Sequence, residues 1–453
     1  MKKLMLFSLL AALANAALAA DTNAPANAPA WPDRPLSQVD CLNIALAQNA
    51  SLLKAKNDLE AAQGVVVQTR AVALPQLQAG GRYQDMAESL VQNIPISGVP
   101  TPPHQSWNAD VLLVQNIYAG GRMTAAFKGA AATRRQALAQ YQTVLADTLL
   151  AVRLAYYDVL LAGQQIIVNE ASVKLLQNEL EDQQRRYNAG TVPHFNVLRA
   201  EVAVANAKPA LIHARSLYRI AKNALVNQLG YNLPREVLED IPMTLTDNFN
   251  TAPWDLALPD AIQTALERRT ELKALREEIT LQEVNVVNAR AGYKPTLQAF
   301  AGYNWMNNSY STDLSDKLDG WIAGGQVSWN LFDGALTIGK VRQARALQQK
   351  SQTNLADQGR QVELGVRTAY SDFIEAKEVL DSQTKVQEQA EEALREAKAR
   401  FDAGTGTQLD VLDAETSLTQ ARTTQVLAQH DYAAARARLE RAIGANQAPA
   451  NKG

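Results

Sequence analysis

An internal duplication is the sequence feature that most constrains the fold. The stretch RFDAGTGTQLDVLDAE (residues 400–415) aligns without a gap with RYNAGTVPHFNVLRAE (residues 186–201), at a shift of 214 positions. Arg, Ala-Gly-Thr, Val-Leu and Ala-Glu recur at the same places. In each copy a helical pattern runs into a glycine, the residue that most readily adopts the left-handed conformation that ends a helix. We therefore expect two copies of one helical hairpin tip.

The same register continues beyond the tips, because Tyr156 matches Tyr370 and Leu229-Gly230 matches Ile443-Gly444. Each half reads as helix, strand, strand, long helix, tip and helix. The first helix of each half is expected as one segment, over residues 36–72 and 256–291. The first predicted repeat covers residues 36–230, with strands at about 74–84 and 107–118. The second covers residues 256–444, with strands at about 294–305 and 320–332. A linker at 231–255 joins the two repeats, and a tail follows at 445–453.

The long helices carry an apolar residue at almost every seventh position. The stripes are Val152, Val159, Ile166, Val173, Leu180 and Tyr187 in the first half, and Val366, Phe373, Leu380, Gln387, Leu394 and Phe401 in the second. A sustained period of 3.5 residues indicates coiled-coil packing with left-handed supercoiling. A single helix over residues 122–188 would be about 100 Å long at 1.5 Å per residue. The predicted molecule is therefore a rod or tube rather than a compact globule.

The predicted strands suggest a membrane. Residues alternate between an apolar face that contains Trp321 and Trp329 and a face of small and polar side chains, and Trp305 lies on the partner strand. Trp321 and Trp329 would lie about 26 Å apart along a strand, or about 20 Å vertically when tilted, close to the ~25 Å apolar band between aromatic girdles in outer-membrane barrels. A soluble sheet with one buried face is the alternative. Four strands cannot close a barrel, since the smallest have about eight, and open edges are not tolerated in lipid. A membrane sheet therefore requires several chains.

The N-terminus predicts export. Lys2 and Lys3 precede an apolar core, and Ala17-Leu18-Ala19 supplies a small-x-small cleavage signal, so residues 1–19 are predicted as a signal peptide rather than a short buried helix. The formal charge of −2 gives no basic excess for nucleic acid. The single cysteine, Cys41, excludes an intramolecular disulfide and a cysteine-based zinc site. No later segment offers the ~20 apolar residues of a transmembrane helix.

Together these features resemble the TolC-like outer membrane efflux protein family. The resemblance covers about residues 36–444 and rests on the duplicated architecture, the signal peptide and the two Gly-Thr tips, followed by Asn196-Val197-Leu198 and Asp410-Val411-Leu412-Asp413. It implies a mainly α fold with a membrane β part. Three chains would form a 12-stranded β-barrel in the outer membrane, continuous with a long α-helical coiled-coil barrel across the periplasm. It also implies that a periplasmic adaptor and an inner-membrane transporter, of RND or ABC type, engage the tips.

Asp410 and Asp413 match the paired gate aspartates of the family. Their i, i+3 spacing places both carboxylates on one helix face. In a trimer they would form two stacked rings that favour cations, and repulsion between like charges would raise some of their pKa values. The alternative is structural, because Thr407 and Asp410 also fit a capping box. Capping would explain Asp410 but not Asp413.

The resemblance further implies that the tips dock the adaptor, through Gly190 with Thr191 and Gly404 with Thr405. The entrance departs from the family pattern at three positions that would hold it closed. Gly406 stands where an arginine can occur, Phe401 where a tyrosine can, and Asn196 where an aspartate can. Arg400 or Arg199 could supply a substitute link.

Signals for catalysis are weak. The run GALTIGK at 334–340 imitates a phosphate-binding loop, but Val341 replaces the required Ser or Thr. The four histidines show no metal-ligand spacing. We therefore predict no enzyme, no cofactor and no metal.

The predicted function is a passive exit duct in the Gram-negative outer membrane, energised by its partners. A pore-less periplasmic coiled-coil scaffold is the alternative from another class, and the outer-membrane component of type I protein secretion is the alternative within the duct class.

Overall fold

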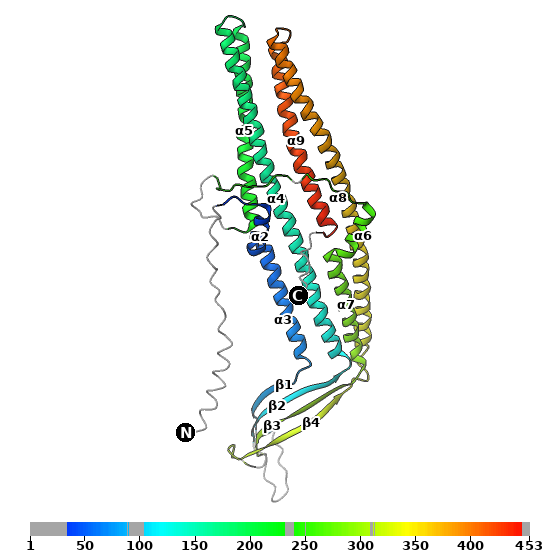
Figure 1. The fold of residues 1–453 in the computed structure, drawn as a ribbon. Helices are drawn as coiled ribbons and strands as arrows, with labels where there is room; N and C mark the ends of the chain where they lie inside the picture. Colours follow the sequence, from blue (N-terminus) through cyan, green and yellow to red (C-terminus); the bar gives the residue numbers. More distant parts are fainter. Residues whose placement is uncertain are drawn as a thin grey trace, which may run out of the picture.

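The computed structural model describes residues 34–87, 89, 104–231, 240–249, 251–308, 311 and 313–445. The predicted signal peptide lies outside these residues, as do part of the linker and nearly all of the tail. In the described part of the chain, long helices form an elongated rod that stands on one end of a curved sheet (Figure 1). The two hairpin tips lie at the opposite end of the rod from the sheet.

The two halves repeat the same order of elements, as predicted. The first half contains α2 (Gln38–Gln48), α3 (Ala50–Ala71), β1 (Gln76–Asp85), β2 (Gln105–Ala119), α4 (Arg122–Asn188) and α5 (His194–Leu229). The second contains α6 (Leu258–Arg268), α7 (Thr270–Arg290), the 3-10 turn η3 (Ala291–Tyr293), β3 (Thr296–Asn307), β4 (Lys317–Ser328), α8 (Leu336–Asp402) and α9 (Gln408–Ala442). Helices α4 and α8 have 67 residues each, so each is about 100 Å long.

The first predicted helix of the first half is divided into α2 and α3, which corrects the single segment at 36–72. The break is at Asn49, whose backbone leaves the helical region at φ −59° and ψ 125°. The Asn49 side chain accepts hydrogen bonds from the backbone N–H groups of Ser51 (2.9 Å) and Leu52 (3.3 Å). Its Nδ2 donates to the carbonyl of Gln228 (2.7 Å), near the end of α5. Asn49 therefore caps the start of α3 and also bonds the end of α5.

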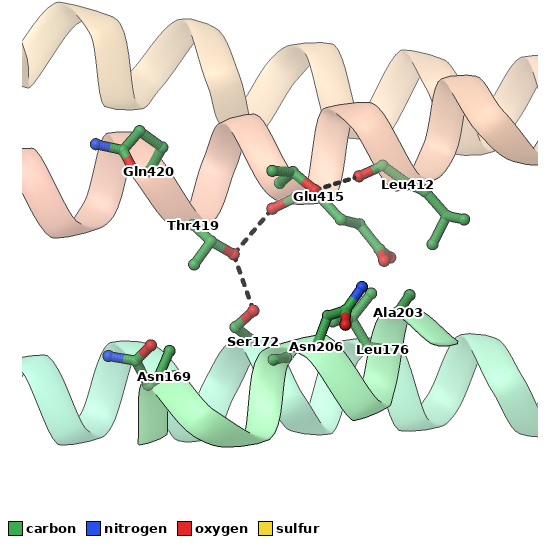
Figure 2. A pocket seen from close by; sticks show the side chains of 12 residues that line it. Asn169, Ser172, Leu176, Ala203, Asn206, Leu412, Glu415, Thr419 and Gln420 are labelled. Carbon is green, nitrogen blue, oxygen red and sulfur yellow. Dashed lines mark hydrogen bonds between the residues drawn. The ribbon is translucent and has the colours of Figure 1, made fainter. Parts of the chain in front are cut away.

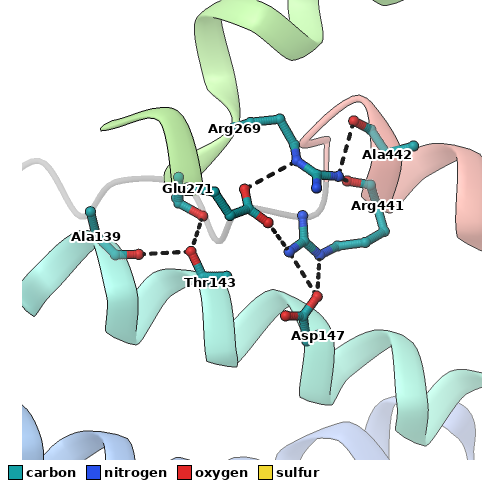
Figure 3. A network of polar contacts seen from close by, with 8 residues as sticks. Ala139, Thr143, Asp147, Arg269, Glu271, Arg441 and Ala442 are labelled. Carbon is teal, nitrogen blue, oxygen red and sulfur yellow. Dashed lines mark hydrogen bonds and ion pairs between the residues drawn. The ribbon is translucent and has the colours of Figure 1, made fainter. Parts of the chain in front are cut away.

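The second half has the equivalent break at Arg269, which divides the predicted helix at 256–291 into α6 and α7. Arg269 has nearly the same backbone geometry, φ −57° and ψ 125°. Its Nη1 donates to the carbonyls of Arg441 and Ala442, both at 3.3 Å, at the end of α9 (Figure 3). An asparagine and an arginine thus bond the end of the outgoing helix in the two halves, and Asn49 in addition caps the helix that follows it.

A polar network centred on the buried Arg441 surrounds this second junction (Figure 3). The side chain of Arg441 is 8% exposed, and its guanidinium binds Asp147 of α4 (2.7 Å) and Glu271 of α7 (2.7 Å). Arg269 also pairs with Glu271, at 3.1 Å. Burial acts to raise the pKa of Glu271, but its hydrogen bond with Arg441 and the two positive charges outweigh burial and lower it. The network fixes α4, α7 and α9 to one another near the middle of the rod.

The seven-residue stripes form the cores of the helical layer. Val152 and Val159 are buried with Tyr156 in one cluster, which the α5 residues Leu225 and Leu229 complete. The second half contains an equivalent cluster whose buried members include Val366, Phe373, Leu272, Tyr432 and Leu439. The predicted coiled-coil seam is therefore the packed face of α4 and α8.

The four strands form one antiparallel sheet in the order β1-β2-β3-β4. Tyr303 of β3 pairs with Val111 of β2 and with Trp321 of β4, and Val111 pairs with Ala79 of β1. One face therefore carries the large exposed apolar side chains Leu77, Tyr83, Leu113, Trp321 and Val327. The other face carries polar residues that include Gln78, Arg82, Asp110, Asn304 and Gln326.

Trp329 lies outside the strand to which the sequence assigned it. Strand β4 ends at Ser328, opposite Thr296, where its partner β3 begins. The hydrogen-bonded pairing of β4 with β3 therefore ends at Ser328. Trp329 instead donates from Nε1 to the carbonyl of Tyr293 (3.1 Å), at the junction with the helices.

Candidate functional site at the helical tips

Both tips have the same hydrogen-bonded geometry. At the first tip, the N–H of Gly190 donates to the Tyr187 carbonyl (2.8 Å) and that of Thr191 donates to the Arg186 carbonyl (2.9 Å). At the second tip, the equivalent bonds are from Gly404 to Phe401 (3.1 Å) and from Thr405 to Arg400 (2.9 Å). This pair of bonds defines the Schellman motif. Both glycines have positive φ, +75° and +72°, as expected from their position in the repeat.

The tip residues predicted to dock a partner are all exposed. The Thr191 hydroxyl donates to the Arg186 carbonyl (2.9 Å), and the Thr405 hydroxyl donates to the Arg400 carbonyl (3.2 Å). Both hydroxyls therefore satisfy carbonyl groups at helix ends, which fixes the shape of the exposed surface at each tip.

Gly406 has a structural role that the sequence did not reveal. A Cβ at this position would lie 3.0 Å from the Arg400 Cβ and 3.1 Å from the Phe401 nitrogen. Its N–H also donates to the Arg400 carbonyl (3.0 Å). Any side chain would push the loop away from the end of α8, which is a physical reason for glycine here.

Asp410 takes part in the capping box that the sequence offered as an alternative. Its Oδ2 accepts from the Thr407 N–H and from the Thr407 hydroxyl, both at 2.8 Å. These hydrogen bonds lower the pKa of Asp410. The predicted repulsion between carboxylates of three chains would act in the opposite direction.

Asp413, one turn further along α9, is exposed. It has no hydrogen-bond or ion-pair partner among the residues that the structure describes. Capping therefore accounts for Asp410 and leaves Asp413 without a structural role in a single chain. Both carboxylates are exposed in the first turns of α9, on one side of the helix.

The two hairpins are linked by Arg186, which the sequence analysis did not single out. Its Nη2 lies 2.7 Å from Asp402 Oδ1, and its Nε lies 2.6 Å from Asp182 Oδ2. The guanidinium also stacks over the Phe401 ring, 4.7 Å from the centroid. Phe401 thus uses its ring face where a tyrosine hydroxyl would have been expected to act.

The two arginines suggested from the sequence remain on their own hairpins. Arg400 lies 3.9 Å from Glu396 on the same helix, and Arg199 stacks over Phe195, 4.8 Å from the ring centroid. Arg186 is the twin of Arg400 in the repeat, but the sequence alone does not indicate which arginine reaches across.

A second link joins the starts of the two outgoing helices. Gln408, which is 3% exposed, donates from Nε2 to the Asn196 carbonyl (3.1 Å). Asn196 therefore contributes its backbone to the contact between the hairpins. The predicted gate residues Asn196, Phe401 and Gly406 are brought together at this end of the molecule.

The predicted girdle residues lie at the other end. Trp321 is 81% exposed on the apolar face of the sheet, and Trp305 lies beside Tyr303, with ring centroids 4.8 Å apart. Trp107 was missed, although its Nε1 donates to the Leu314 carbonyl (2.9 Å). Its place on β2, opposite Tyr83 of β1, could have indicated it.

The described helices include none with the length and apolar character needed to cross a membrane. Across the same residues, no group of three or more His, Cys, Asp and Glu side chains is arranged to hold a metal ion.

Comparison with known proteins identifies a family to which most of the chain is similar. A model of the family described as outer membrane efflux protein matches residues 41–231 and 261–445. The alkaline protease secretion protein AprF of Pseudomonas aeruginosa is 24% identical over 412 residues, which cover 89% of this chain and 83% of that protein. The outer membrane protein TolC of Vibrio cholerae is 25% identical, with 89% of each chain covered. The solved structure of the Campylobacter jejuni CmeC outer membrane channel superimposes with a TM-score of 0.77, at 16% identity, over 90% of this chain and 85% of that one.

Proposed function

The chain belongs to the outer membrane efflux protein family, and from this membership we propose that three copies form an exit duct whose entrance is ringed by Asp410 and Asp413. Members of the family are non-enzymatic channels of the outer membrane that serve efflux and secretion. The predicted absence of catalysis and the predicted location agree with this membership. A pore-less periplasmic scaffold does not agree with membership of this family.

The sheet supports the trimer. Among the described residues, strands β1 and β4 are each paired on one side, so both outer edges of the sheet carry unpaired backbone groups. Such edges are not tolerated in lipid, and four strands are too few to close a barrel. Three copies would pair β1 of one chain with β4 of the next and give twelve strands. The apolar face with Trp321 would then face the lipid, and the polar face would line the duct.

The carboxylate of Asp413, exposed and without a partner among the described residues, is the observation that carries the gate proposal. Helix capping explains Asp410 but does not require an acid one turn later. Three copies around an axis would bring three Asp413 and three Asp410 carboxylates together at the tips, where they would attract cations and repel anions.

Bilayer recordings of the purified protein test the gate. We expect Asp410→Ala combined with Asp413→Ala to increase single-channel conductance and to weaken both cation preference and block by divalent cations. Glu378→Ala combined with Asp381→Ala is the matched control, because it removes two exposed acids at the same spacing from α8. Equal conductance and ion preference in wild type and in the tip variant would refute the gate.

We further propose that the tips at Gly190, Thr191, Gly404 and Thr405 dock a periplasmic adaptor, which connects the duct to an inner-membrane transporter of RND or ABC type. The fixed loop geometry and the exposure of both tips support this proposal. Photocrosslinkers placed at Thr191 and Thr405 in cells, followed by identification of the captured protein, test it. Capture from a position on the sheet but not from the tips would contradict it.

Protein secretion is the second candidate. It is favoured by the similarity to AprF, whose name describes alkaline protease secretion. The adaptor captured at the tips distinguishes the two candidates, because its transporter is either a drug or metal pump or a protein secretion ATPase.

A further inference from the structure

A cavity lies between the two hairpins, below the tips. It has a volume of about 370 Å³ and is walled by α4, α5 and α9 (Figure 2). Its polar lining includes Asn169 and Ser172 of α4, Asn206 of α5, and Glu415 and Thr419 of α9. The Thr419 hydroxyl donates to the Ser172 Oγ (3.1 Å), which joins the hairpins at one end of the cavity.

The side chain of Glu415 points from α9 into this space (Figure 2). Glu415 is 2% exposed, and neither carboxylate oxygen accepts a hydrogen bond from a described residue. Its nearest charge is Lys398 of α8, whose Nζ lies 3.2 Å from Oε1 in an ion pair. Lys398 approaches from outside the cavity and does not line it. Oε2 therefore has no partner in the described part of the chain.

The surroundings of Glu415 contain one excess negative charge. Glu179 of α4, 9% exposed, is close enough for its charge to help raise the pKa of Glu415, although burial is the larger cause. Within the described part of the chain, the Glu179 side chain accepts one hydrogen bond, from the neutral amide of Gln183 (2.8 Å). Among the described residues, Lys398 is thus the one cation paired with these two buried carboxylates, and it is paired with Glu415. An uncompensated buried charge is costly, so the site is electrostatically incomplete.

We propose that this cavity binds a small organic cation, a primary ammonium or guanidinium group on an apolar body, with Glu415 as its counterion. A single positive charge balances the site. The amides of Asn169 and Asn206 can accept or donate hydrogen bonds beside it, and Leu176 and Leu412 offer apolar contact. The volume lies within the usual 300–1,000 Å³ range of small-molecule sites and is much larger than one inorganic ion needs.

The chemistry of the walls argues against a divalent metal. Among the described residues, no third His, Cys, Asp or Glu joins the two carboxylates in a metal-binding arrangement. The ammonium of Lys398 beside Glu415 would also repel a dication. A monovalent cation that donates hydrogen bonds meets neither obstacle.

Ligand-observed NMR and titration calorimetry on the purified, detergent-solubilised protein test the site, with benzylammonium as the probe and benzyl alcohol as its neutral counterpart. We expect saturable binding of benzylammonium and none of the alcohol. Glu415→Gln should weaken binding roughly tenfold or more, because it removes the buried counterion and keeps the shape. Asp381→Asn, which removes an exposed charge elsewhere on the rod, should leave binding unchanged.

A second variant separates binding from folding. Ala203→Met would fill part of the cavity and retain every charge, so it should also weaken binding by a similar factor. Unchanged affinity in both variants, equal binding of the alcohol, or displacement of the probe by equimolar potassium chloride would each overturn the proposal. The measurement needs no pore activity, so its outcome is independent of the gate.

Discussion

Arg186 Nη2 lies 2.7 Å from Asp402 Oδ1 and thereby joins the end of α4 to the end of α8. The duplicated sequence does not repeat this link. The twin of Arg186 is Arg400, but the twin of Asp402 is Asn188, which carries no charge. Asn188 instead accepts from Gln184 on its own helix (3.3 Å). Divergence of the two copies has thus left the Arg186–Asp402 ion pair at the tips without a counterpart from the other half, and the Phe401 ring supports this pair.

The Arg186 link should restrain movement of one hairpin against the other. Arg186→Ala is expected to raise the open probability of the channel in bilayers by about fivefold, the effect of about 1 kcal/mol, because it removes a partly exposed ion pair and a cation–π contact. Arg185→Ala is the control, since Arg185 pairs with Asp182 on the same helix (3.2 Å) and does not cross to α8. High salt should reduce the difference between wild type and variant. Equal open probabilities in the Arg186→Ala and Arg185→Ala variants would show that the link has no role in gating.

The network around Arg441 should contribute strongly to stability. Arg441→Met leaves Glu271 and Asp147 without their shared partner and removes the clamp on the end of α9. Breaking a buried pair from one side typically costs about 3–5 kcal/mol, and Asp147 and Glu271 are partly exposed, so we expect a value near the lower end. Denaturant unfolding of the solubilised protein measures the loss. Arg438→Met, at an exposed position on the same helix, should change stability by less than about 0.5 kcal/mol.

The order of the elements was predictable because the duplication and the seven-residue stripes are long-range patterns that chance does not maintain. The helix breaks were not predictable. Asn49 and Arg269 lie within continuous helical patterns, and each breaks the helix by capping a helix end that is distant in sequence, at Gln228 and at Arg441. Trp329 was misplaced for a related reason, since a strand ends where its partner begins and alternation alone does not show where that is.

For the candidate site too, local features were predictable from the sequence and contacts between distant residues were not. Asp410 and the tip glycines could be identified because capping and left-handed geometry are local properties of the chain. Arg186 could not, because its role depends on which residue of the other hairpin lies opposite. Glu415 was also overlooked, since burial of a carboxylate within a charged helix leaves no local sequence signal.

Stability should depend on pH through His430, which joins α9 to α4. Its ring nitrogens lie 2.9 Å from Asp431 Oδ1 and 3.0 Å from Asp158 Oδ1, and the side chain is 12% exposed. Burial acts to lower the pKa of His430, but the two carboxylates outweigh it and raise the pKa. A group whose pKa is raised by folding stabilises the fold fully below its unfolded value, about 6.5, and this contribution is lost as pH rises through the folded value.

We therefore expect part of the unfolding free energy to be lost as the pH rises above about 6.5, through the raised folded pKa of His430. His430→Gln should remove this part of the pH dependence. His213→Gln changes an exposed histidine on α5 and should leave the profile as in wild type. Unfolding curves at a series of pH values provide the measurement. A profile that keeps its slope in His430→Gln would show that other groups are responsible.

The tip glycines provide the last prediction, because geometry rather than space requires them. A Cβ added at Gly404 would meet no atom within 4 Å, but the φ of +72° is unfavourable for any residue with a Cβ. Gly404→Ala should cost about 1–2 kcal/mol, seen as faster amide exchange at Thr405, whose N–H bonds to Arg400. Asn tolerates this conformation, so Gly404→Asn should cost less. Gly64 offers the matched control, since it is equally uncrowded but lies inside α3. Gly64→Ala should stabilise its helix by about 0.5–1 kcal/mol. The same substitution is therefore expected to raise stability at Gly64 and to lower it at Gly404. A change of stability in the same direction at both sites would contradict the backbone argument.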